Sequence, residues 1–287
     1  MRSTGCWRLA ESPHRDAVRR ALEEDRAADD VTTALLGAAA RRPACAQFVA
    51  EGRFVVAGLP MVALVYTELD PEARVEALCA DGAWVTAGAV LARAGASAAT
   101  LLSGERVALN FLQRLSGIAT VTRRVVEAVE GTRSRITHTR KTTPGLRALE
   151  TYAVTVGGGV ENRHSLAGAV LWKDNHWALL GSGDLARALR AAPSGLAVVV
   201  EVENDAQLER AVAAGVRHIL VDNQPPERVA AWVRRAGPEV TVQASGGITP
   251  ETARAYAEAG AHLISMGSLT HSAPAAPIRV DMLPGVD

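Results

Sequence analysis

The fold and the chemistry of this chain centre on three short runs: THTRKTTPGLR at residues 137–147, VGGGVENR at residues 156–163 and LWKDNH at residues 171–176. Each run places Arg or Lys beside residues that form tight turns. Arg offers a planar fork of donors that matches carboxylates and phosphates, whereas Lys offers a compact charge. Consecutive glycines let backbone N–H groups approach an anion closely, and Pro144 predicts the first turn of a helix, where anions are also favoured. The three runs therefore predict an anion-binding site rather than solvated surface loops.

The second half of the chain alternates apolar runs with helical patterns. Strands are expected at residues 135–139, 169–173, 197–203, 218–222, 240–244 and 262–266, and helices at 146–156, 185–192, 206–214, 227–236 and 251–259. Continuous Val, Ile and Leu runs indicate a parallel sheet covered by helices. Polar or glycine-rich motifs follow each strand, as at the C-terminal face of a (β/α) barrel. Because six strands are fewer than eight, the pattern predicts an incomplete (β/α) barrel, with an open doubly wound sheet as the alternative.

The first half of the chain has a different pattern. Residues 74–102 alternate short apolar runs with Asp-Gly and Ala-Gly turn signals, which indicates strands. A long helix is expected at residues 103–131, with Ser103 as N-cap and Gly131 as its end. The chain is therefore expected to be an α/β protein with two domains. The first would be an N-terminal α+β sandwich domain that comprises residues 1–115 and is joined by the C-terminal segment 272–287. The incomplete barrel would be the catalytic domain, residues 116–271.

The composition excludes several classes of partner. The 287 residues include 31 basic and 31 acidic side chains, so no global field recruits nucleic acid or an anionic membrane. No apolar run approaches the roughly 20 residues of a membrane span, and residues 1–20 lack the apolar core of a signal peptide. Three cysteines, Cys6, Cys45 and Cys79, have no Cys-x-x-Cys spacing. These features predict a cytoplasmic protein with reduced thiols and no nucleic-acid or membrane partner.

The three runs resemble the motifs of the quinolinate phosphoribosyltransferase family, the carboxylating nicotinate-nucleotide pyrophosphorylases. Further matching segments are GERVALNFLQRLSGIAT (104–120), EVEN (201–204), LVDN (220–223), ASGGIT (244–249) and GSLTHSAP (267–274). The resemblance covers nearly the whole chain after about residue 23. It implies the two-domain architecture described above. It also implies phosphoribosyl transfer from phosphoribosyl pyrophosphate to quinolinate with decarboxylation, which gives nicotinate mononucleotide, pyrophosphate and CO₂ in NAD biosynthesis.

Arginines are suited to the acceptor, a pyridine dicarboxylate. Arg140 and Arg163 could clamp its two carboxylates bidentately. The resemblance implies that Arg106 joins them from the partner subunit of a homodimer, or a higher homo-oligomer, with a shared active site. It also places Asn162 and His138 in the acceptor pocket.

The remaining motifs suit the donor, phosphoribosyl pyrophosphate. Lys141 and Lys173 would neutralise the leaving pyrophosphate. The 5′-phosphate would be held by Ser245, Gly246 and Gly247 before a helix start, and by Gly267 with His271 nearby. Glu201 and Glu203 alternate with Val202 and should share one face of a strand. Catalytic roles are expected for Lys141, Lys173, Glu203 and Asp222. Glu203 and Asp222 would also bind Mg²⁺, partly through water, unless these carboxylates form structural salt bridges with Lys141 or Lys173.

Two positions depart from the family pattern. Asn162 stands where the family has His, and His138 stands where it has Asp. These changes leave the phosphoribose motifs untouched. The alternative function is therefore a paralogous phosphoribosyltransferase that acts on another heteroaromatic carboxylic acid in secondary metabolism, and a non-catalytic binding protein of the same fold is a further possibility.

Overall fold

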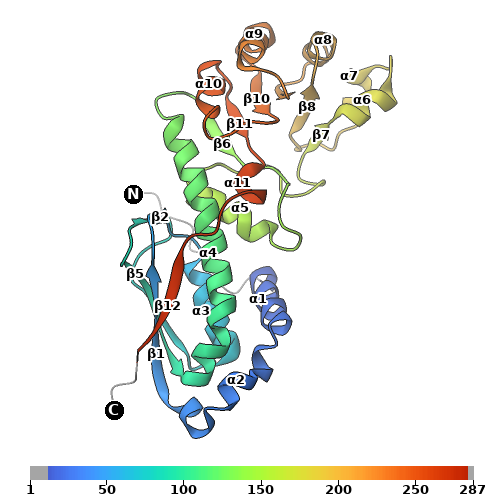
Figure 1. The fold of residues 1–287 in the computed structure, drawn as a ribbon. Coiled ribbons are helices and arrows are strands. Elements are labelled where there is room, and N and C mark those ends of the chain that lie inside the picture. Colours follow the sequence, from blue (N-terminus) through green and yellow to red (C-terminus); the bar gives the residue numbers. More distant parts are fainter. Residues whose placement is uncertain (1–11, 284–287) are drawn as a thin grey trace. The chain divides into compact units, whose positions relative to one another are not determined.

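The computed structural model describes residues 12–283 and contains two compact units, which we describe separately (Figure 1). Unit 1 comprises residues 1–120, 143–157 and 273–287, and unit 2 comprises residues 121–142 and 158–272. Residues 1–11 lie outside the described residues. They include Cys6 and the first part of the segment 1–20, in which the sequence analysis expected no signal peptide. Cys45 and Cys79 are free thiols. Residues 143–157, which the sequence-based division placed with the barrel, group instead with unit 1.

Unit 1 is built on a four-stranded antiparallel sheet of order β12-β1-β5-β3. Its strands are β1 (Pro43–Ala50), β3 (Arg74–Ala77), β5 (Val90–Ser97) and β12 (Ile278–Leu283), and β2 (Phe54–Val55) pairs separately with β4 (Trp84–Val85). The C-terminal strand β12 lies beside β1 along its length, so the end of the chain completes this sheet (Figure 1).

Helices of unit 1 are α1 (Ser12–Glu24), η1 (Ala27–Asp29), α2 (Val31–Ala34), η2 (Gly37–Arg41), α3 (Leu59–Leu69), α4 (Ala98–Ala128) and α5 (Arg147–Val156), with α4 continuing into unit 2. The expected start of α4 at residue 103 was wrong. The Ser97 hydroxyl accepts from the Thr100 N–H at 3.1 Å and caps the helix five residues earlier, whereas Ser103 donates to Asp30 at 3.1 Å. Pro144 was also misplaced, because it lies in a turn before α5.

Unit 2 contains six parallel strands in the order β6-β11-β10-β9-β8-β7. They are β6 (Arg135–Thr137), β7 (Val170–Trp172), β8 (Val198–Val202), β9 (His218–Asp222), β10 (Thr241–Ser245) and β11 (Leu263–Ser265). The first strand pairs with the last, and the sheet opens only between β6 and β7. This cyclic order is that of a barrel, and it confirms the incomplete (β/α) barrel over the doubly wound sheet, whose strand order reverses at a switch point.

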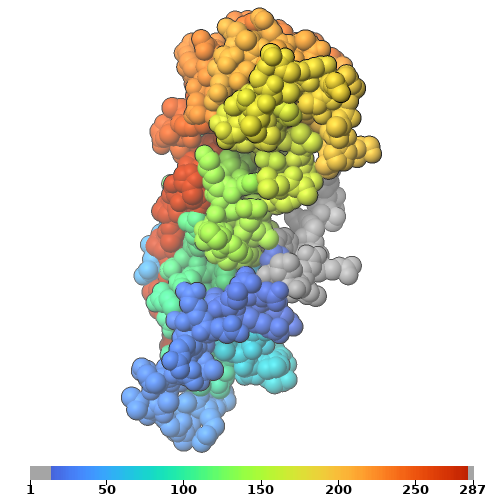
Figure 2. All heavy atoms as spheres, turned by 90° about the vertical axis from the view of Figure 1, so that its right-hand side faces the viewer, coloured from blue at the N-terminus to red at the C-terminus, as the bar shows by residue number. Residues whose placement is uncertain are grey.

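Helices follow the strands of this barrel. Its outside is covered by α6 (Asp174–Leu180), α7 (Leu185–Leu189), α8 (Asp205–Ala213), α9 (Pro226–Ala236) and α10 (Ala253–Glu258), whereas the short α11 (Ser268–His271) follows the carboxyl end of β11. The side chains of α6 to α9 form one continuous yellow-to-orange surface of unit 2 in Figure 2. Within residues 12–283, no helix is long and apolar enough to cross a membrane.

Strand alternation divides the side chains of the barrel into two sets. Val200, Ile219, Val221, Val242 and Ile264 point outward and are buried beneath helices. The residues between them point inward. Burial of the first set fixes the register of each strand, because a slip by one residue would turn every apolar side chain inward. The inward set is therefore available for chemistry.

Candidate active site

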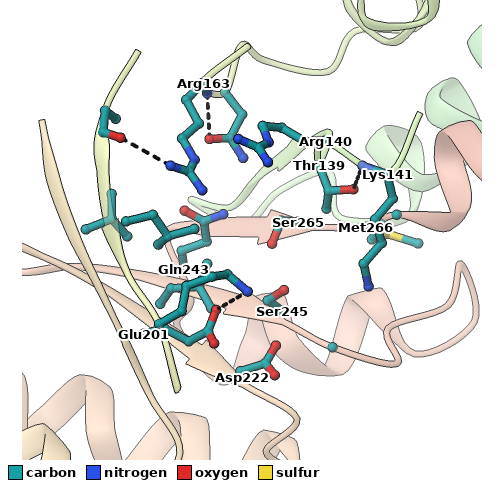
Figure 3. A pocket seen from close by; sticks show the side chains of 18 of the residues that line it. Thr139, Arg140, Lys141, Arg163, Glu201, Asp222, Gln243, Ser245, Ser265 and Met266 are labelled. Carbon is teal, nitrogen blue, oxygen red and sulfur yellow. Dashed lines mark hydrogen bonds and ion pairs between the residues drawn. The ribbon is translucent and has the colours of Figure 1, made fainter. Parts of the chain in front are cut away.

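A cavity of about 1440 Å³ opens inside the barrel of unit 2. Every strand contributes residues at or after its carboxyl end, and Figure 3 shows them pointing into one space. The predicted site residues that line it are Arg140, Lys141, Asn162, Arg163, Lys173, Glu201, Asp222, Ser245, Gly246, Gly247, Gly267 and His271. The structure thus brings together most of the residues singled out in the sequence.

The register of the strands arranges the inward side chains in rows. The upper row contains Asp222 and Ser245, which are paired neighbours on β9 and β10. The row below contains Glu201, Leu220 and Gln243 on β8, β9 and β10. Two residues along a parallel strand span about 6.6 Å, so the second row lies about that much deeper in the barrel.

Arg140 and Arg163 give one side of the cavity a strong positive charge (Figure 3). Burial, together with the neighbouring charge of Arg140, lowers the pKa of Arg163. One N–H of the Arg163 guanidinium donates to the Ala169 carbonyl at 3.2 Å. Among the described residues, neither arginine has a carboxylate within ion-pair distance. Glu201 acts on Arg163 only from beyond ion-pair distance, so these two adjacent cations make this wall a receptor for an anion.

Glu201 and Lys173 form an ion pair on the opposite side, with Nζ and Oε2 3.3 Å apart. Glu201 is buried, and burial raises the pKa of its carboxyl, while Lys173 opposes that rise and Asp222 adds to it. The adjacent Asp222 is half-buried and accepts from the Asn223 side-chain amide at 2.7 Å. Carboxylates can accept hydroxyl hydrogens or bind a cation, so Glu201 and Asp222 can each serve in either way.

Three glycines, Gly246, Gly247 and Gly267, line the rim of the cavity where the 5′-phosphate was expected, and we call this part the phosphate rim. Gly246 and Gly247 have φ angles of 86° and 60°, a backbone region that favours glycine. A Cβ atom on Gly246 would lie 2.2 Å from Oδ1 of Asn223, so only glycine fits there. Gly267 packs closely against Lys141 and His271, and the Thr270 hydroxyl donates to the Lys141 carbonyl at 2.7 Å. These contacts hold the basic loop after β6 against the turn after β11.

Three predicted site residues do not line the cavity. Glu203 was expected to share the face of Glu201, but β8 ends at Val202 and Glu203 is exposed. Arg106 is exposed on α4 in unit 1, in the interior of the helix rather than in its first turn. His138 is fully buried behind the end of β6.

The sequence analysis missed two polar residues deep in the barrel. Gln243 and His218 line the cavity, and the His218 Nε2 lies 2.8 Å from the Gln243 Oε1. Gln243 could have been found by the same alternation that paired Glu201 with Glu203, because it lies two residues before Ser245. His218 could not, because a histidine at the start of a strand carries no signal of its own.

Two places in unit 2 offer carboxylate or imidazole ligands that a metal ion could use. Asp222 fits Mg²⁺, because its oxygens face the cavity beside the phosphate rim. Within residues 12–283, one further group could hold a metal ion: His138, Glu161 and His164 place ligand atoms within 4.8 Å of one another. However, the Nε2 of His138 already accepts from the Asn162 N–H at 3.1 Å. That nitrogen is therefore not available as a ligand in the observed arrangement.

Comparison with known proteins also divides the chain into two domains, with the boundary between residues 116 and 118. Residues 30–116 match the family described as quinolinate phosphoribosyl transferase, N-terminal domain, and residues 118–281 match its C-terminal domain. A nicotinate-nucleotide pyrophosphorylase [carboxylating] from Mycobacterium leprae is 41% identical over 275 residues, 93% of this chain and 96% of the relative. A probable enzyme of the same name from Bacillus subtilis is 41% identical over 239 residues, 83% of each chain.

A solved structure shows the same fold. The crystal structure of nicotinate-nucleotide pyrophosphorylase from Ehrlichia chaffeensis superposes with a TM-score of 0.88 at 33% identity, covering 93% of this chain and 98% of that one. The sequence matches span both parts of the chain, and the cavity contains Arg140, Lys141, Arg163, Lys173, Glu201 and Asp222 of the charged residues that the resemblance implied. The chain belongs to the quinolinate phosphoribosyltransferase family.

Proposed function

We propose that the protein is a carboxylating nicotinate-nucleotide pyrophosphorylase, which transfers the phosphoribosyl group of phosphoribosyl pyrophosphate to quinolinate. The observation that carries this proposal is the pair of guanidinium groups, Arg140 and Arg163, that face one cavity without a carboxylate partner among the described residues. A pyridine dicarboxylate supplies the two anionic groups that such a pair binds bidentately. The family membership and the names of the relatives support the same activity.

The donor binds along the upper row and the rim. Backbone N–H groups at Ser245, Gly246 and Gly247 hold the 5′-phosphate, with Gly267 and His271 beside it. Lys141 and Lys173 neutralise the pyrophosphate. Asp222 would hold Mg²⁺ together with water and pyrophosphate oxygens, and Mg²⁺ would supply further charge neutralisation for the leaving group. Glu203 as a second ligand stays a prediction.

The reaction is mainly one of positioning and charge stabilisation. The ring nitrogen of quinolinate attacks C1 of the ribose as the bond to pyrophosphate breaks. Glu201 and Asp222 stabilise the oxocarbenium-like transition state and bind ribose hydroxyls. The carboxylate next to the nitrogen then leaves as CO₂, and its bonding electrons pass into the cationic ring before a proton replaces it. The products are nicotinate mononucleotide, pyrophosphate and CO₂.

We also propose that the enzyme acts as a cytoplasmic homodimer, or a larger homo-oligomer, with Arg106 contributing to the partner's site. Val31, Leu35 and Leu36 are 78%, 87% and 46% exposed around α2, an apolar cluster that suits a subunit interface. Arg106 is exposed, and no described residue forms a salt bridge with it.

A product assay with labelled donor tests the activity. Quinolinate, nicotinate, and other pyridine and azole acids are offered with phosphoribosyl pyrophosphate and Mg²⁺, and mononucleotide, pyrophosphate and CO₂ are measured. We expect quinolinate to be the best acceptor. Turnover of another heteroaromatic acid without any quinolinate turnover would contradict the proposal and establish the paralogous function.

A further inference from the structure

The floor of the cavity contains a neutral amide in an otherwise charged site. Gln243 is 3% exposed and lies in the second row, where Leu220 separates it from Glu201. Two strand spacings place it about 9.5 Å from Glu201 across the barrel. In Figure 3 its amide points into the cavity between Arg163 and Glu201.

His218 fixes the orientation of this amide. The Oε1 of Gln243 is 2.8 Å from the Nε2 of His218, so the imidazole N–H donates to the amide oxygen. Burial lowers the pKa of His218, which keeps the ring neutral with a single N–H to donate. With its oxygen bound to His218, the amide turns its NH₂ group toward the cavity.

The NH₂ group has no acceptor among the described residues. The amide therefore presents two free donors to the cavity, where water or a ligand can accept from them. A hydrogen-bond acceptor on a substrate that enters the barrel below the upper row would replace that water.

The acceptor substrate fits this position better than the donor does. The phosphate rim and Asp222 lie at the upper row and above it, whereas Gln243 lies one row deeper. Leu220, on the neighbouring strand, offers the apolar surface that the face of a heteroaromatic ring needs. Arg163 lies on the same side as Gln243 in Figure 3 and can hold the same carboxylate.

We infer that Gln243 donates a hydrogen bond to a carboxylate of the pyridine acceptor, whose ring lies against Leu220, and that this contact helps to select a dicarboxylate over a monocarboxylate. The inference rests on the proposed function. Gln243 is a specificity residue for the acceptor, and His218 is a positioning residue that acts through it.

The test compares Gln243→Met, which keeps the size and removes both donors, with Gln47→Met, the same change on strand β1 of unit 1. KM is measured for quinolinate at saturating donor and for the donor at saturating quinolinate. A hydrogen bond to a charged group corresponds to roughly ten- to 150-fold in affinity. We expect Gln243→Met to raise the KM for quinolinate by about that range, with the KM for the donor changed less than about twofold. Gln47→Met should change neither value.

Calorimetry provides a readout that a purely structural role would not alter. Quinolinate, nicotinate and picolinate are titrated into the wild type and Gln243→Met. One of the two monoacids lacks the carboxylate that Gln243 contacts. In Gln243→Met, the ratio of quinolinate affinity to the affinity for that monoacid should fall by the same factor as the affinity for quinolinate itself. His218→Phe should weaken quinolinate binding less than Gln243→Met does, because the amide remains but can rotate. If Gln243→Met does not fold, Gln243→Glu keeps the shape, and its added negative charge should weaken quinolinate binding still more.

Two results would overturn the inference: a folded Gln243→Met or Gln243→Glu with quinolinate affinity within about twofold of wild type, or equal loss of affinity for all three acids. Wild-type turnover of quinolinate alongside either result would leave the proposed function standing. A wild type that turns over no quinolinate would contradict the proposed function. In that case the inference is judged by calorimetry, and binding of none of the three acids would overturn it as well.

Discussion

Asn162 holds the loop after β6 and the loop that carries Arg163 together through His138. Its backbone N–H donates to the His138 Nε2 at 3.1 Å, and its side-chain amide donates to the His138 carbonyl at 2.8 Å. The Asn162 Oδ1 accepts from the Arg163 N–H at 2.8 Å. Both the NH₂ group and the oxygen of the Asn162 amide therefore already bond to the protein. Asn162 and His138 were both expected to bind the acceptor. His138 is fully buried and does not line the cavity, whereas Asn162 lines it and also supports Arg163, so its contact with the acceptor stays a prediction.

Asn162→Ala should consequently act through Arg163. It removes two neutral hydrogen bonds, each contributing about 0.5–1.5 kcal/mol, so we expect the KM for quinolinate to rise roughly five- to 150-fold. The KM for the donor should stay within about twofold, because the phosphate rim is untouched. Steady-state kinetics with each substrate varied in turn measures both values. An unchanged KM for quinolinate in the folded variant would show that the hydrogen bonds of Asn162 do not position Arg163.

Glu150 is the centre of a buried polar cluster in unit 1. It is 0% exposed and accepts from Nε and Nη2 of Arg114 at 3.1 and 2.9 Å, and from the N–H and hydroxyl of Thr143 at 3.0 and 2.8 Å. Arg114 also donates to the Ala273 carbonyl at 3.0 Å. The cluster thereby ties together the three chain segments that make up this unit.

Glu150→Ala should be strongly destabilising, because breaking a buried ion pair leaves an uncompensated charge and costs about 3–5 kcal/mol. Urea unfolding measures the change. The control is Glu258→Ala, which removes an exposed i,i+4 pair with Arg254 that contributes about 0.3–0.5 kcal/mol. Equal effects from the two variants would mean that burial of the cluster does not govern its energy.

The sequence predicted all six strands of the barrel to within two residues at each end, because buried parallel strands read as continuous apolar runs. Strand β9 matches its expected bounds of 218–222 at both ends. The failures occurred where a side chain has a partner that is distant in the sequence or unexpected. Ser103 has the pattern of an N-cap, yet its hydroxyl bonds to Asp30 of the preceding segment. His138 was expected in the acceptor pocket, yet it is fully buried and its carbonyl accepts from the Asn162 amide.

Gly246 provides a test of the phosphate rim. Gly246→Ala would force a Cβ to within 2.2 Å of Oδ1 of Asn223 and would strain a backbone with φ of 86°. We expect the KM for phosphoribosyl pyrophosphate to rise at least about tenfold, since displaced N–H groups would no longer match the phosphate. Gly215→Ala is the matched control, because its φ is 76° and its Cβ would meet no atom within 4 Å. The control should lose about 1 kcal/mol of stability and keep its affinity for the donor.

The half-buried His218 predicts a pH dependence of stability. Its folded-state pKa is lowered by burial, so the unfolded chain takes up the proton at a higher pH than the folded protein does. The free energy of unfolding should therefore fall as the pH drops below about 6.5 and should be regained above it. His218→Phe should show a smaller loss between pH 7.5 and 5.5 in urea unfolding. Identical losses in the wild type and the variant would remove His218 as the source.

The shared active site can be tested by mixing two inactive variants. Arg106→Ala and Arg140→Ala each remove a guanidinium expected to bind the acceptor, one from the partner's side and one from within the cavity. In a mixed dimer, one of the two sites receives both intact arginines. Random mixing in equal amounts makes half of the dimers mixed, so about a quarter of the wild-type activity should return in a closed twofold assembly. Subunits carrying different affinity tags allow the mixed dimer to be isolated and assayed. If the purified mixed dimer has no activity, Arg106 does not act across the interface. If each single variant already has wild-type KM for quinolinate, neither arginine binds the acceptor.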